Sequence, residues 1–538
     1  MRKKLLSILA LLCLTVTSAW AASWTSGSCT VTLTSGTLTV SGTGAMDDYT
    51  SLSYVPWKSV RTSITSIVIN DGVTRIGDNA FYGCSNLTSV NIGSGVTSIG
   101  QNAFITCSNL TTVDIPDNVE TIGVSAFQSC TRLTTVTIGK GATDIDRTAF
   151  YGCSDLVSFT VDGDNTAYSS EDDVLFNKSK TTLFKYPAKK SGTTYNIPAT
   201  VTTIEYAAFG YCSSLTTIDI PYGVTTLEDF AFIDCSGLTS ITIPASVTTI
   251  EWCAFQSCSG LTSITLPASV TTIGNFVFNN CSSLASVTIY APSLTTYGYN
   301  AFGDDITAPT IYVFSDCLGT YQSWWSEYFS SIEAISDVTV SGVTARQDPE
   351  NTADYWSTYY HPAANVSIST EGVEIFKASL SGSTLTLTKV DGSVIKAGQP
   401  VVLKATAGGD LSMQLTSTTT ASDFSGNDLK GTTASITGAA GNIYVLNAKA
   451  GTGAGFYKLK ASGTLSANKA YLTYSGSSAP EYLDFNEDNT TAVSDALTAK
   501  SEPLDADAAW YTLHGVKLAG KPVQKGVYVV NGRKVVIK

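Results

Sequence analysis

A phenylalanine that recurs at every twenty-third position, followed three positions later by a cysteine, constrains the fold of this chain more than any other feature. Two runs carry the pattern, namely Phe81, Phe104, Phe127 and Phe150, then Phe209, Phe232, Phe255 and Phe278, with cysteines from Cys84 to Cys281. A fixed period of about 20 to 50 residues is the signature of a solenoid, in which every repeat is one turn of a coil. The sequence therefore predicts a stack of turns.

One unit, residues 110–130, indicates how a turn is built. Val113 to Ile115 alternate apolar and polar side chains, as a short strand does. Pro116 then ends the strand because proline has no N–H to donate. The apolar residues of the return arm follow at spacings of about three to four; they are Val119, Ile122, Ala126, Phe127 and Cys130. We predict a β-rich solenoid of short parallel strands with helical or irregular return arms.

A single turn of this kind cannot fold alone. Each buried apolar side chain contributes roughly 1.5–3 kcal/mol, whereas ordering the backbone costs roughly 1–2 kcal/mol per residue. Stacked turns cover one another, so only the two ends need caps. We expect an N-terminal cap over residues 23–63 and repeats over 64–335, closed by the aromatic run from Tyr321 to Phe329.

Residues 238–258, Leu-Thr-Ser-Ile-Thr-Ile-Pro-Ala-Ser-Val-Thr-Thr-Ile-Glu-Trp-Cys-Ala-Phe-Gln-Ser-Cys, resemble the BspA-type leucine-rich repeats of bacterial surface proteins. The resemblance covers residues 28–335, where nine units carry an Ala-Phe pair or, once, Val277-Phe278. It implies display at the cell surface and adhesion or binding to host proteins. It implies no particular ligand.

The regular spacing is interrupted between Cys153 and Cys212, an interval more than twice as long as the period. The irregular insert, residues 161–196, contains several aromatic residues and the pair Lys189-Lys190. In one interpretation it is a stretched repeat whose aromatic side chains continue the core. In the other it carries a basic and aromatic patch that contacts a partner, since insertions in solenoids are often on the binding face.

Residues 1–22 are typical of a signal peptide. Residues 2–4 are basic, an apolar stretch follows, and residues 19–21 have the small-x-small form of a cleavage site. No later apolar run approaches the ~20 residues that a membrane span needs, so we expect no transmembrane segment in the mature chain. A net charge of −13 makes nucleic acid a poor partner. We expect an exported protein, either on the cell surface at the outer membrane or secreted.

Eleven cysteines remain once the leader is removed. In a parallel stack the repeated cysteines would lie roughly 4.8 Å apart with parallel Cβ bonds, whereas a disulfide needs Cβ atoms about 3.8 Å apart. We therefore predict a buried ladder of free thiols that pack as small apolar groups, with disulfides as the alternative. Metal binding by the cysteines is disfavoured because no histidine lies near Cys253 and Cys258.

Beyond the repeats, alternating stretches separated by Gly, Asn and Ser are typical of a β-sandwich, which we place at residues 336–485. Through residues 355–360, 395–403 and 455–458, this part resembles a β-sandwich module of Bacteroidetes surface proteins. Residues 486–509 form an acidic linker that is too polar to bury a core.

The last segment, residues 510–538, contains six Lys and Arg residues and no acidic residue. Its end predicts a hairpin around Asn531-Gly532, a pair that two-residue turns favour. The segment is similar to the C-terminal sorting domains of type IX secretion substrates, which implies transport across an outer membrane. Alternatively, the hairpin is a closing edge of the sandwich.

The residues give little support for catalysis. The two histidines, His361 and His514, fall in different predicted domains, so no Ser-His or Cys-His pair is indicated. Three acids recur with the period of the phenylalanines and would form a column on adjacent turns: Glu205, Glu228 and Glu251. Because like charges in a column favour a bound cation, it either binds calcium or remains a solvated ladder. No other cofactor is predicted.

Aromatic residues accompany this acidic column. The candidate partner-binding residues are Tyr206, Asp229, Phe230, Trp252 and Phe276. Tyr and Trp dominate the hot spots of protein interfaces, so this is the surface of the repeats that we expect to bind.

We therefore predict a non-enzymatic binding platform for an extracellular protein of a host matrix or a neighbouring cell. The alternative is a glycan-binding or envelope-structural protein, in which the sandwich binds and the repeats act as a spacer.

Overall fold

The computed structural model describes residues 22–303, most of 309–487 with short gaps, and three strands within 510–537. Residues 1–486 form one compact unit and residues 487–538 a second. The expected leader, residues 1–22, and linker, residues 486–509, therefore lie almost wholly outside the described residues. Both remain predictions.

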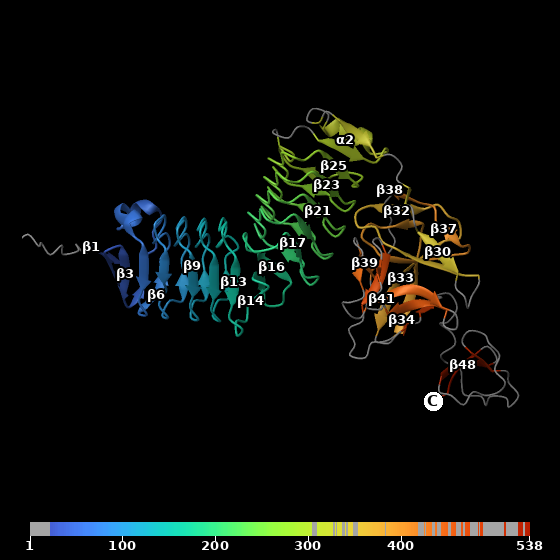
Figure 1. Ribbon diagram of the computed structural model, residues 1–538, viewed down its shortest axis with the longest axis horizontal. Helices are drawn as coiled ribbons and strands as arrows, with labels where there is room; N and C mark the ends of the chain where they lie inside the picture. The colour runs from blue at the N-terminus through green and yellow to red at the C-terminus, as the bar shows by residue number, and fades with distance from the viewer. Residues whose placement is uncertain are drawn as a thin grey trace, which may run out of the picture. The chain divides into compact units, whose positions relative to one another are not determined.

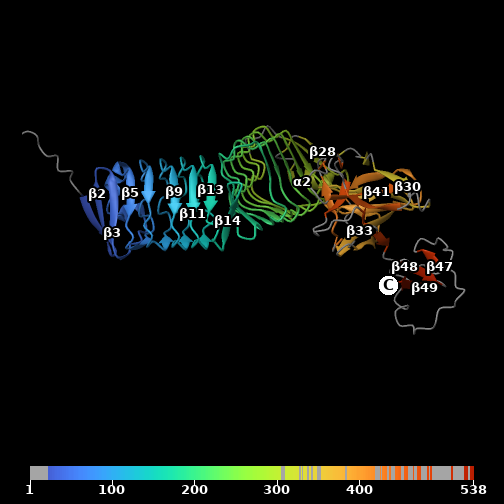
Figure 2. The ribbon, with the colours of Figure 1, turned by 60° about the horizontal axis from the view of Figure 1, so that its bottom comes forward.

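The repeat region is a β-solenoid, as the sequence predicts. Each turn contributes one longer strand, and these strands stack side by side in parallel (Figure 1, Figure 2). The register follows the repeat, because Val113, Val136 and Phe159 lie opposite one another. The longer strands are β5 (Ser66–Ile69), β7 (Ser89–Asn91), β9 (Thr112–Ile115), β11 (Thr135–Ile138), β13 (Ser158–Val161), β17 (Thr194–Asn196), β19 (Thr217–Asp219), β21 (Ser240–Thr242), β23 (Ser263–Leu266), β25 (Ser286–Ile289), β27 (Thr310–Val313) and β28 (Ile332–Ala334).

A second parallel column is built from shorter strands. These are β4 (Gly44–Ala45), β6 (Val73–Ile76), β8 (Ser98–Ile99), β10 (Thr121–Ile122), β12 (Asp144–Ile145), β18 (Thr203–Ile204), β20 (Thr226–Leu227), β22 (Thr249–Ile250), β24 (Thr272–Ile273) and β26 (Thr296–Tyr297). The Ala-Phe segment returns the chain as a series of turns. The return arms are therefore irregular.

The repeated phenylalanines form a stacked ladder inside the coil. The ring centroids of Phe104 and Phe127 are 5.2 Å apart, and those of Phe232 and Phe255 are also 5.2 Å apart. The backbone supports the same stacking, because the N–H of Phe104 donates to the carbonyl of Ala126 in the next turn at 2.7 Å. Each turn thus buries the apolar side chains of its neighbour, which a single turn could not bury by itself.

The repeated cysteines are buried free thiols, which confirms the predicted ladder. In six of them the thiol Sγ donates a hydrogen bond to the phenylalanine carbonyl of the preceding turn at 3.1–3.3 Å. These are Cys107, Cys130, Cys153, Cys235, Cys258 and Cys281. The pattern therefore combines a small apolar group with one donor per turn.

The insert contains one further, degenerate turn. It consists of β14 (Tyr168–Glu171), β15 (Val174–Asn177) and β16 (Thr182–Lys185), and it continues into β17. Tyr186 lies one period before Phe209 and stacks on it at 5.2 Å, so it occupies the position of the repeated phenylalanine. Phe176 and Phe184 are buried as well. The stretched-repeat interpretation is confirmed.

Two lysines of the insert, Lys185 and Lys190, are buried. Lys190 is paired with Asp172 at 3.1 Å and with Asp173 at 3.3 Å. Lys185 takes the position of the repeated alanine and is buried, and its Nζ donates to the carbonyl of Ala207 at 2.5 Å. Burial lowers the pKa of Lys185. Lys185 and Lys190 are therefore unavailable for a basic patch, whereas Lys189 is exposed, so the alternative interpretation stays a prediction.

Antiparallel strands begin the N-terminal cap. They are β1 (Ala22–Ser26), β2 (Cys29–Thr34) and β3 (Thr37–Gly42), followed by the short helices η1 (Leu52–Tyr54) and η2 (Lys58–Ser63). β3 then pairs in parallel with β5 and starts the longer column. Trp57 is fully buried against Phe81, with 6.1 Å between the ring centroids. It closes the phenylalanine ladder at this end.

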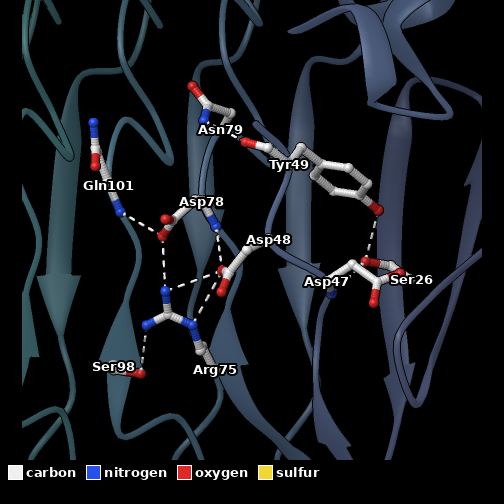
Figure 3. Close-up of polar contacts among 9 residues, drawn as sticks. All are labelled: Ser26, Asp47, Asp48, Tyr49, Arg75, Asp78, Asn79, Ser98 and Gln101. Atoms are coloured by element: carbon white, nitrogen blue, oxygen red, sulfur yellow. Dashed lines mark hydrogen bonds and ion pairs between the residues drawn. The ribbon is translucent and has the colours of Figure 1, made fainter. Parts of the chain in front are cut away.

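Figure 3 shows the polar contacts that hold this cap to the first turns. Arg75 contacts Asp48 at 3.0 Å and Asp78 at 2.7 Å. Partial burial acts to raise the pKa of Asp48, but the N–H of Asp78 and the guanidinium of Arg75 lower it overall. The hydroxyl of Tyr49 donates to Ser26 at 2.8 Å. The contact between Arg75 and Asp48 joins the cap to the first turn, whereas the bond of Tyr49 lies within the cap.

The other end is closed by the helix α2 (Leu318–Trp325). Tyr321 and Trp325 are buried on it, and Trp325 contacts Phe302, the last ring of the ladder, at 5.5 Å. Phe329 packs on Phe302 at 5.2 Å. The aromatic run predicted to close the core does so.

The described residues of 339–487 form small sheets. The first contains β29 (Thr339–Val340), β38 (Met413–Thr416), β32 (Asn365–Ile368) and β35 (Val394–Ile395). The second contains β37 (Gly409–Asp410), β30 (Thr344–Gln347), β31 (Tyr355–Tyr359), β36 (Val401–Ala405), β33 (Glu374–Ser381), β34 (Thr384–Val390) and β46 (Phe485–Glu487). The third contains β39 (Lys430–Thr432), β44 (Lys469–Thr473), β41 (Ile443–Lys449), β42 (Gly453–Lys458) and β45 (Tyr482–Leu483), and β40 (Ile436–Thr437) pairs with β43 (Thr464–Leu465).

The second of these sheets is apolar on both faces. Leu403 packs into a core with Met413 of the first sheet, whereas its neighbour Val402 packs into a core with Phe456 and Leu472 of the third sheet. The described strands therefore form three layers around two cores. The predicted sandwich has two layers, and its alternating pattern does not reveal the extra sheet.

This layered part contacts the repeats within the first unit. The N–H of Ala268 donates to the carbonyl of Ala363 at 2.8 Å, and Gln399 donates to the hydroxyl of Tyr222 at 2.8 Å. His361 lies in the same contact, where its Nδ1 accepts the N–H of Ala364 at 2.8 Å. Burial lowers the pKa of His361 to about 4. This histidine has a structural role.

In the second unit the described residues form a three-stranded antiparallel sheet. Its strands are β47 (Trp510–Thr512), β48 (Gly526–Val530) and β49 (Arg533–Ile537). Val530 pairs with Arg533, so two residues connect the strands and the predicted hairpin is confirmed. Over the described residues of both units, no helix has the length and apolar character of a membrane span.

Candidate functional site

One aromatic residue per turn lies on the surface over five successive turns, at the corner that follows the shorter strands. We call these residues the aromatic stripe; they are Tyr206, Phe230, Trp252, Phe276 and Tyr299. The members alternate between the second and the third residue after the strands β18, β20, β22, β24 and β26. The stripe therefore follows the stack in a zigzag.

Exposure and ring contacts define the surface that the stripe presents. Trp252 is 46% exposed and Tyr299 is 73% exposed, and the remaining members are half-buried. Phe230 contacts Tyr206 and Trp252 edge to face, with 5.4 Å and 4.8 Å between the ring centroids. Phe276 contacts Tyr299 at 5.5 Å in the same way. Such contacts fix the rings while leaving apolar area in water.

Two members of the stripe have an unfavourable backbone conformation. Phe230 has a φ of 59° and Phe276 a φ of 56°, in the left-handed region. The same turn position in earlier repeats holds Asn79, Asn102 or Ser125, which are smaller and also have positive φ. A bulky residue here costs roughly 1–2 kcal/mol. Strain of this kind concentrates at functional sites.

Two tyrosines support one end of the stripe. Tyr151 belongs to the last turn before the insert, and its ring centroid lies 5.7 Å from that of Tyr206 and 5.7 Å from that of Tyr211. The hydroxyl of Tyr211 donates to that of Tyr151 at 3.2 Å. Burial raises the pKa of Tyr206 to about 12, and repulsion from the negative forms of Tyr151 and Asp229 acts in the same direction. These phenols are therefore neutral near pH 7.

The acidic column lies beside the stripe, because Glu205, Glu228 and Glu251 each follow directly after a shorter strand. Partial burial, with repulsion from Glu205, raises the pKa of Glu228, although Arg147 acts to lower it. Within the part of the chain that the structure describes, no three acidic, cysteine or histidine side chains are grouped to hold a metal ion. The geometry therefore adds nothing in favour of calcium at this column.

Asp229 has a structural role that the sequence did not reveal. Its Oδ1 accepts the backbone N–H of Trp252 at 3.0 Å. Asp78 does the same for the N–H of Gln101 at 2.8 Å in the first turns (Figure 3). Asp229 thus positions the backbone that carries Trp252.

An arginine already occupies one end of the surface. The guanidinium of Arg147 lies over the ring of Tyr206, 5.3 Å from its centroid, and 4.0 Å from a carboxylate oxygen of Glu228. Arg147 is the second residue after β12, which is the position of Tyr206 after β18. Arg147 therefore extends the line of the stripe into the repeats that precede the insert.

The segment that carries the stripe has charged side chains of one sign only. Residues 191–345 contain twelve Asp and Glu residues and no Lys, Arg or His. The basic residues of the repeat region all come earlier, and Arg147 reaches the stripe across the insert. This surface therefore attracts positive charge.

The structure brings together most of the predicted binding residues. Tyr206, Phe230 and Trp252 form one contact group, while Phe276 contacts Tyr299 instead.

Sequence reasoning missed four residues of this surface, which are Tyr299, Tyr151, Tyr211 and Arg147. Tyr299 could have been found, because the interval from Asn275 to Tyr299 shows the same one-residue shift as the interval from Phe278 to Phe302. The others lie across or beside the insert, where the period gives no guide.

The repeats match the family model described as BspA type Leucine rich repeat region, in six copies over residues 59–182 and 180–308. No curated protein matches the chain. The chain is similar to a leucine-rich repeat protein from Eubacterium ventriosum of known crystal structure, with 30% identity and a TM-score of 0.42, over 55% of this chain and 80% of that one.

The chain is also similar to two other solved structures. The pneumococcal vaccine antigen PcpA is 20% identical, with a TM-score of 0.43, over 59% of this chain and 99% of that one. A leucine rich cell surface protein from Faecalibacterium prausnitzii is 25% identical, with a TM-score of 0.32, over 50% of this chain and 94% of that one.

Proposed function

We propose that this chain, which belongs to the BspA-type leucine-rich-repeat proteins through residues 59–308, is an exported, non-enzymatic adhesin that binds an extracellular protein of a host matrix or a neighbouring cell. The aromatic stripe is the observation that carries the proposal. It is a surface of five aromatic side chains in which Trp252 and Tyr299 are open to solvent.

Physical reasons favour a binding role for the stripe over a purely structural one. The phenylalanine ladder already fills the interior, so the outer rings are not needed to close the core. Two of them are held in a strained conformation that Asn or Ser would relieve. Large, preordered aromatic side chains lose little entropy on binding, and they dominate interface energies.

The proposal is tested with the full chain lacking residues 1–21, labelled and applied to intact cells and to immobilised matrix proteins. We expect saturable binding that Trp252→Ala weakens at least about tenfold, because the loss of one aromatic hot spot costs about 2 kcal/mol. Tyr54→Ala is the matched control, since Tyr54 is an aromatic residue of the N-terminal cap that is 69% exposed.

The outcomes separate the roles of the parts. Equal binding by the Trp252→Ala variant and the unchanged chain would remove the stripe from the proposal. Binding to a glycan array but to no protein would favour the alternative, in which the layered part binds and the repeats act as a spacer. Turnover of a polysaccharide or peptide substrate would contradict a non-enzymatic role.

Export and surface attachment form a separate part of the proposal. The leader-like residues 1–22 would direct export, and residues 510–538, which are similar to type IX sorting domains, would direct passage through an outer membrane, as in Bacteroidetes. The hairpin of β48 and β49 is compatible with such a segment. Deletion of residues 510–538 in the producing bacterium should retain the protein in the periplasm, as cell fractionation would show. Unchanged surface display would contradict the sorting role.

A further inference from the structure

Arg147 shows how the stripe binds a cation. Its guanidinium lies over the ring of Tyr206 at 5.3 Å and beside the carboxylate of Glu228 at 4.0 Å. The side chain is 51% exposed, so the contact is formed at the surface. A cation over an aromatic face with a nearby carboxylate gains from both interactions.

Acidic and aromatic residues also adjoin at Trp252, although the carboxylate comes from the same turn as the ring, whereas Glu228 belongs to the turn after Tyr206. Glu251 immediately precedes Trp252, as Glu205 precedes Tyr206. Trp252 is the most favourable ring for a cation, and it is 46% exposed. No basic residue lies within residues 191–345. No arginine of this segment can therefore lie over Trp252 as Arg147 lies over Tyr206.

The spacing of the stripe suits an extended chain. Turns of a parallel stack lie about 4.8 Å apart, so five members span about 19 Å. An extended peptide of about six residues has the same length. A folded domain with a flat surface would contact the exposed Trp252 and Tyr299 but would leave the zigzag unused.

We propose that the aromatic stripe binds an extended segment of a partner protein whose Lys or Arg side chains lie over its rings and beside its glutamates. The inference rests on the proposed function and names the chemistry of the partner. A neutral glycan would also stack on the rings, but it would gain nothing from the uniform negative charge. Nucleic acid and anionic glycans would be repelled by it.

The test uses the full chain lacking residues 1–21 and two synthetic peptides of about eight residues, labelled for fluorescence anisotropy. One alternates Arg with Ser, and the other alternates Gln with Ser. We expect the Arg peptide to bind at least about tenfold more tightly at low salt, and to lose affinity as NaCl is raised. Equal affinities, or an affinity that does not change with salt, would overturn the inference.

Variants locate the binding. Trp252→Ala and Glu251→Gln should each weaken binding of the Arg peptide. The controls Tyr54→Ala and Glu120→Gln should not, because both residues precede the insert and lie outside the stripe. Arg147→Ala should strengthen binding about two- to fivefold, since it frees the ring of Tyr206 and the carboxylate of Glu228 for the peptide. Weaker binding by Arg147→Ala would contradict the role of Arg147 as an internal ligand.

Phe230→Asn separates binding from stability. It introduces the residue that Asn79 and Asn102 provide at the same turn position, where φ is positive. We expect an unchanged or higher Tm together with at least about fivefold weaker peptide binding, because the ring is lost and the backbone strain is relieved. A lower Tm with unchanged binding would mean that the ring is structural.

The failure of this inference differs from the failure of the proposed function. If the chain binds cells or matrix proteins through Trp252 but does not distinguish the two peptides, the proposed function stands and the basic partner is rejected. If neither cells, matrix proteins nor peptides bind, both are rejected.

Discussion

Tyr211, Phe230 and Phe276 adopt positive φ angles in turns that elsewhere use smaller residues such as Asn, Ser and Gly. All three lie in or directly beside the aromatic stripe, and none belongs to the buried ladder. Inside the coil the residues follow ordinary packing rules, so each thiol is buried, as Cys130 is where it bonds to a carbonyl of the preceding turn. The strained aromatic residues are therefore on the surface proposed to bind.

The thiol ladder predicts a clear cost for a small change. Cys130→Ala should lower the free energy of unfolding by about 1–2 kcal/mol, because it leaves a small cavity and removes the Sγ bond to the carbonyl of Phe104. Urea denaturation measures the change. Val124→Ala serves as an exposed control, since Val124 is 44% exposed, and an equal loss in both variants would contradict the packing argument.

The thiols should also be unreactive while the protein is folded. Burial raises the pKa of Cys281 to about 12 and that of Cys153 to about 12, so hardly any reactive thiolate is present at pH 8. We expect alkylation by iodoacetamide only after denaturation, counted by mass spectrometry. Rapid labelling of the native chain would show that the ladder opens.

Among the structural elements, the corner after each shorter strand determines what the surface presents. Before the insert, three of these corners begin with Gly77, Gly100 and Gly123. After it, three begin with Glu205, Glu228 and Glu251, and all five carry an aromatic ring of the stripe on the same backbone. The solenoid thus varies its surface without changing its core. Because the turns are in register, one residue type becomes a continuous line.

In the Arg147→Ala variant, where the carboxylate of Glu228 is free for the peptide, binding of the Arg peptide should depend on the protonation of Glu228. Its pKa lies above the ordinary value of 4.5, chiefly because burial disfavours the charged form and Glu205 repels it; Asp229 and Glu251 add to this, and Arg147 opposes it. Only the charged form attracts a cation. Affinity should therefore fall as pH decreases through this raised pKa, and Glu228→Gln should remove that part of the pH dependence in anisotropy titrations.

At the scale of the whole molecule, the chain forms two units, residues 1–486 and 487–538. Within the first unit, backbone and side-chain hydrogen bonds join the repeats to the layered sheets, as at Ala268 and Tyr222. These contacts follow the longer strands, so they lie at a different corner from the stripe. The stripe remains exposed while the layered part is attached.

Limited proteolysis should reveal this division. The predicted acidic linker, residues 486–509, is too polar to bury a core, so we expect the first cuts there and a resistant fragment ending near residue 486. Mass spectrometry of the fragments identifies the cut. A first cut between the repeats and the layered sheets, near residue 336, would contradict a single compact first unit.

The sequence predicted the solenoid, its register, the thiol ladder and both caps because each depends on a period that is visible in one dimension. Residues one period apart must meet in a stack, so Phe104 and Phe127 had to touch. The candidate binding residues Tyr206, Phe230 and Trp252 were found for the same reason, since they stand at nearly equivalent positions of neighbouring turns.

Only the tertiary structure decided the features that break the period. The insert restores one turn through Tyr186 and brings Arg147 and Tyr151 beside Tyr206, although the whole insert separates them in sequence. The layered sheets likewise arise from strand pairings between distant segments, which alternation alone does not specify. Local periodicity fixes contacts between equivalent positions, whereas contacts across an irregular segment depend on where the folded chain resumes its stack.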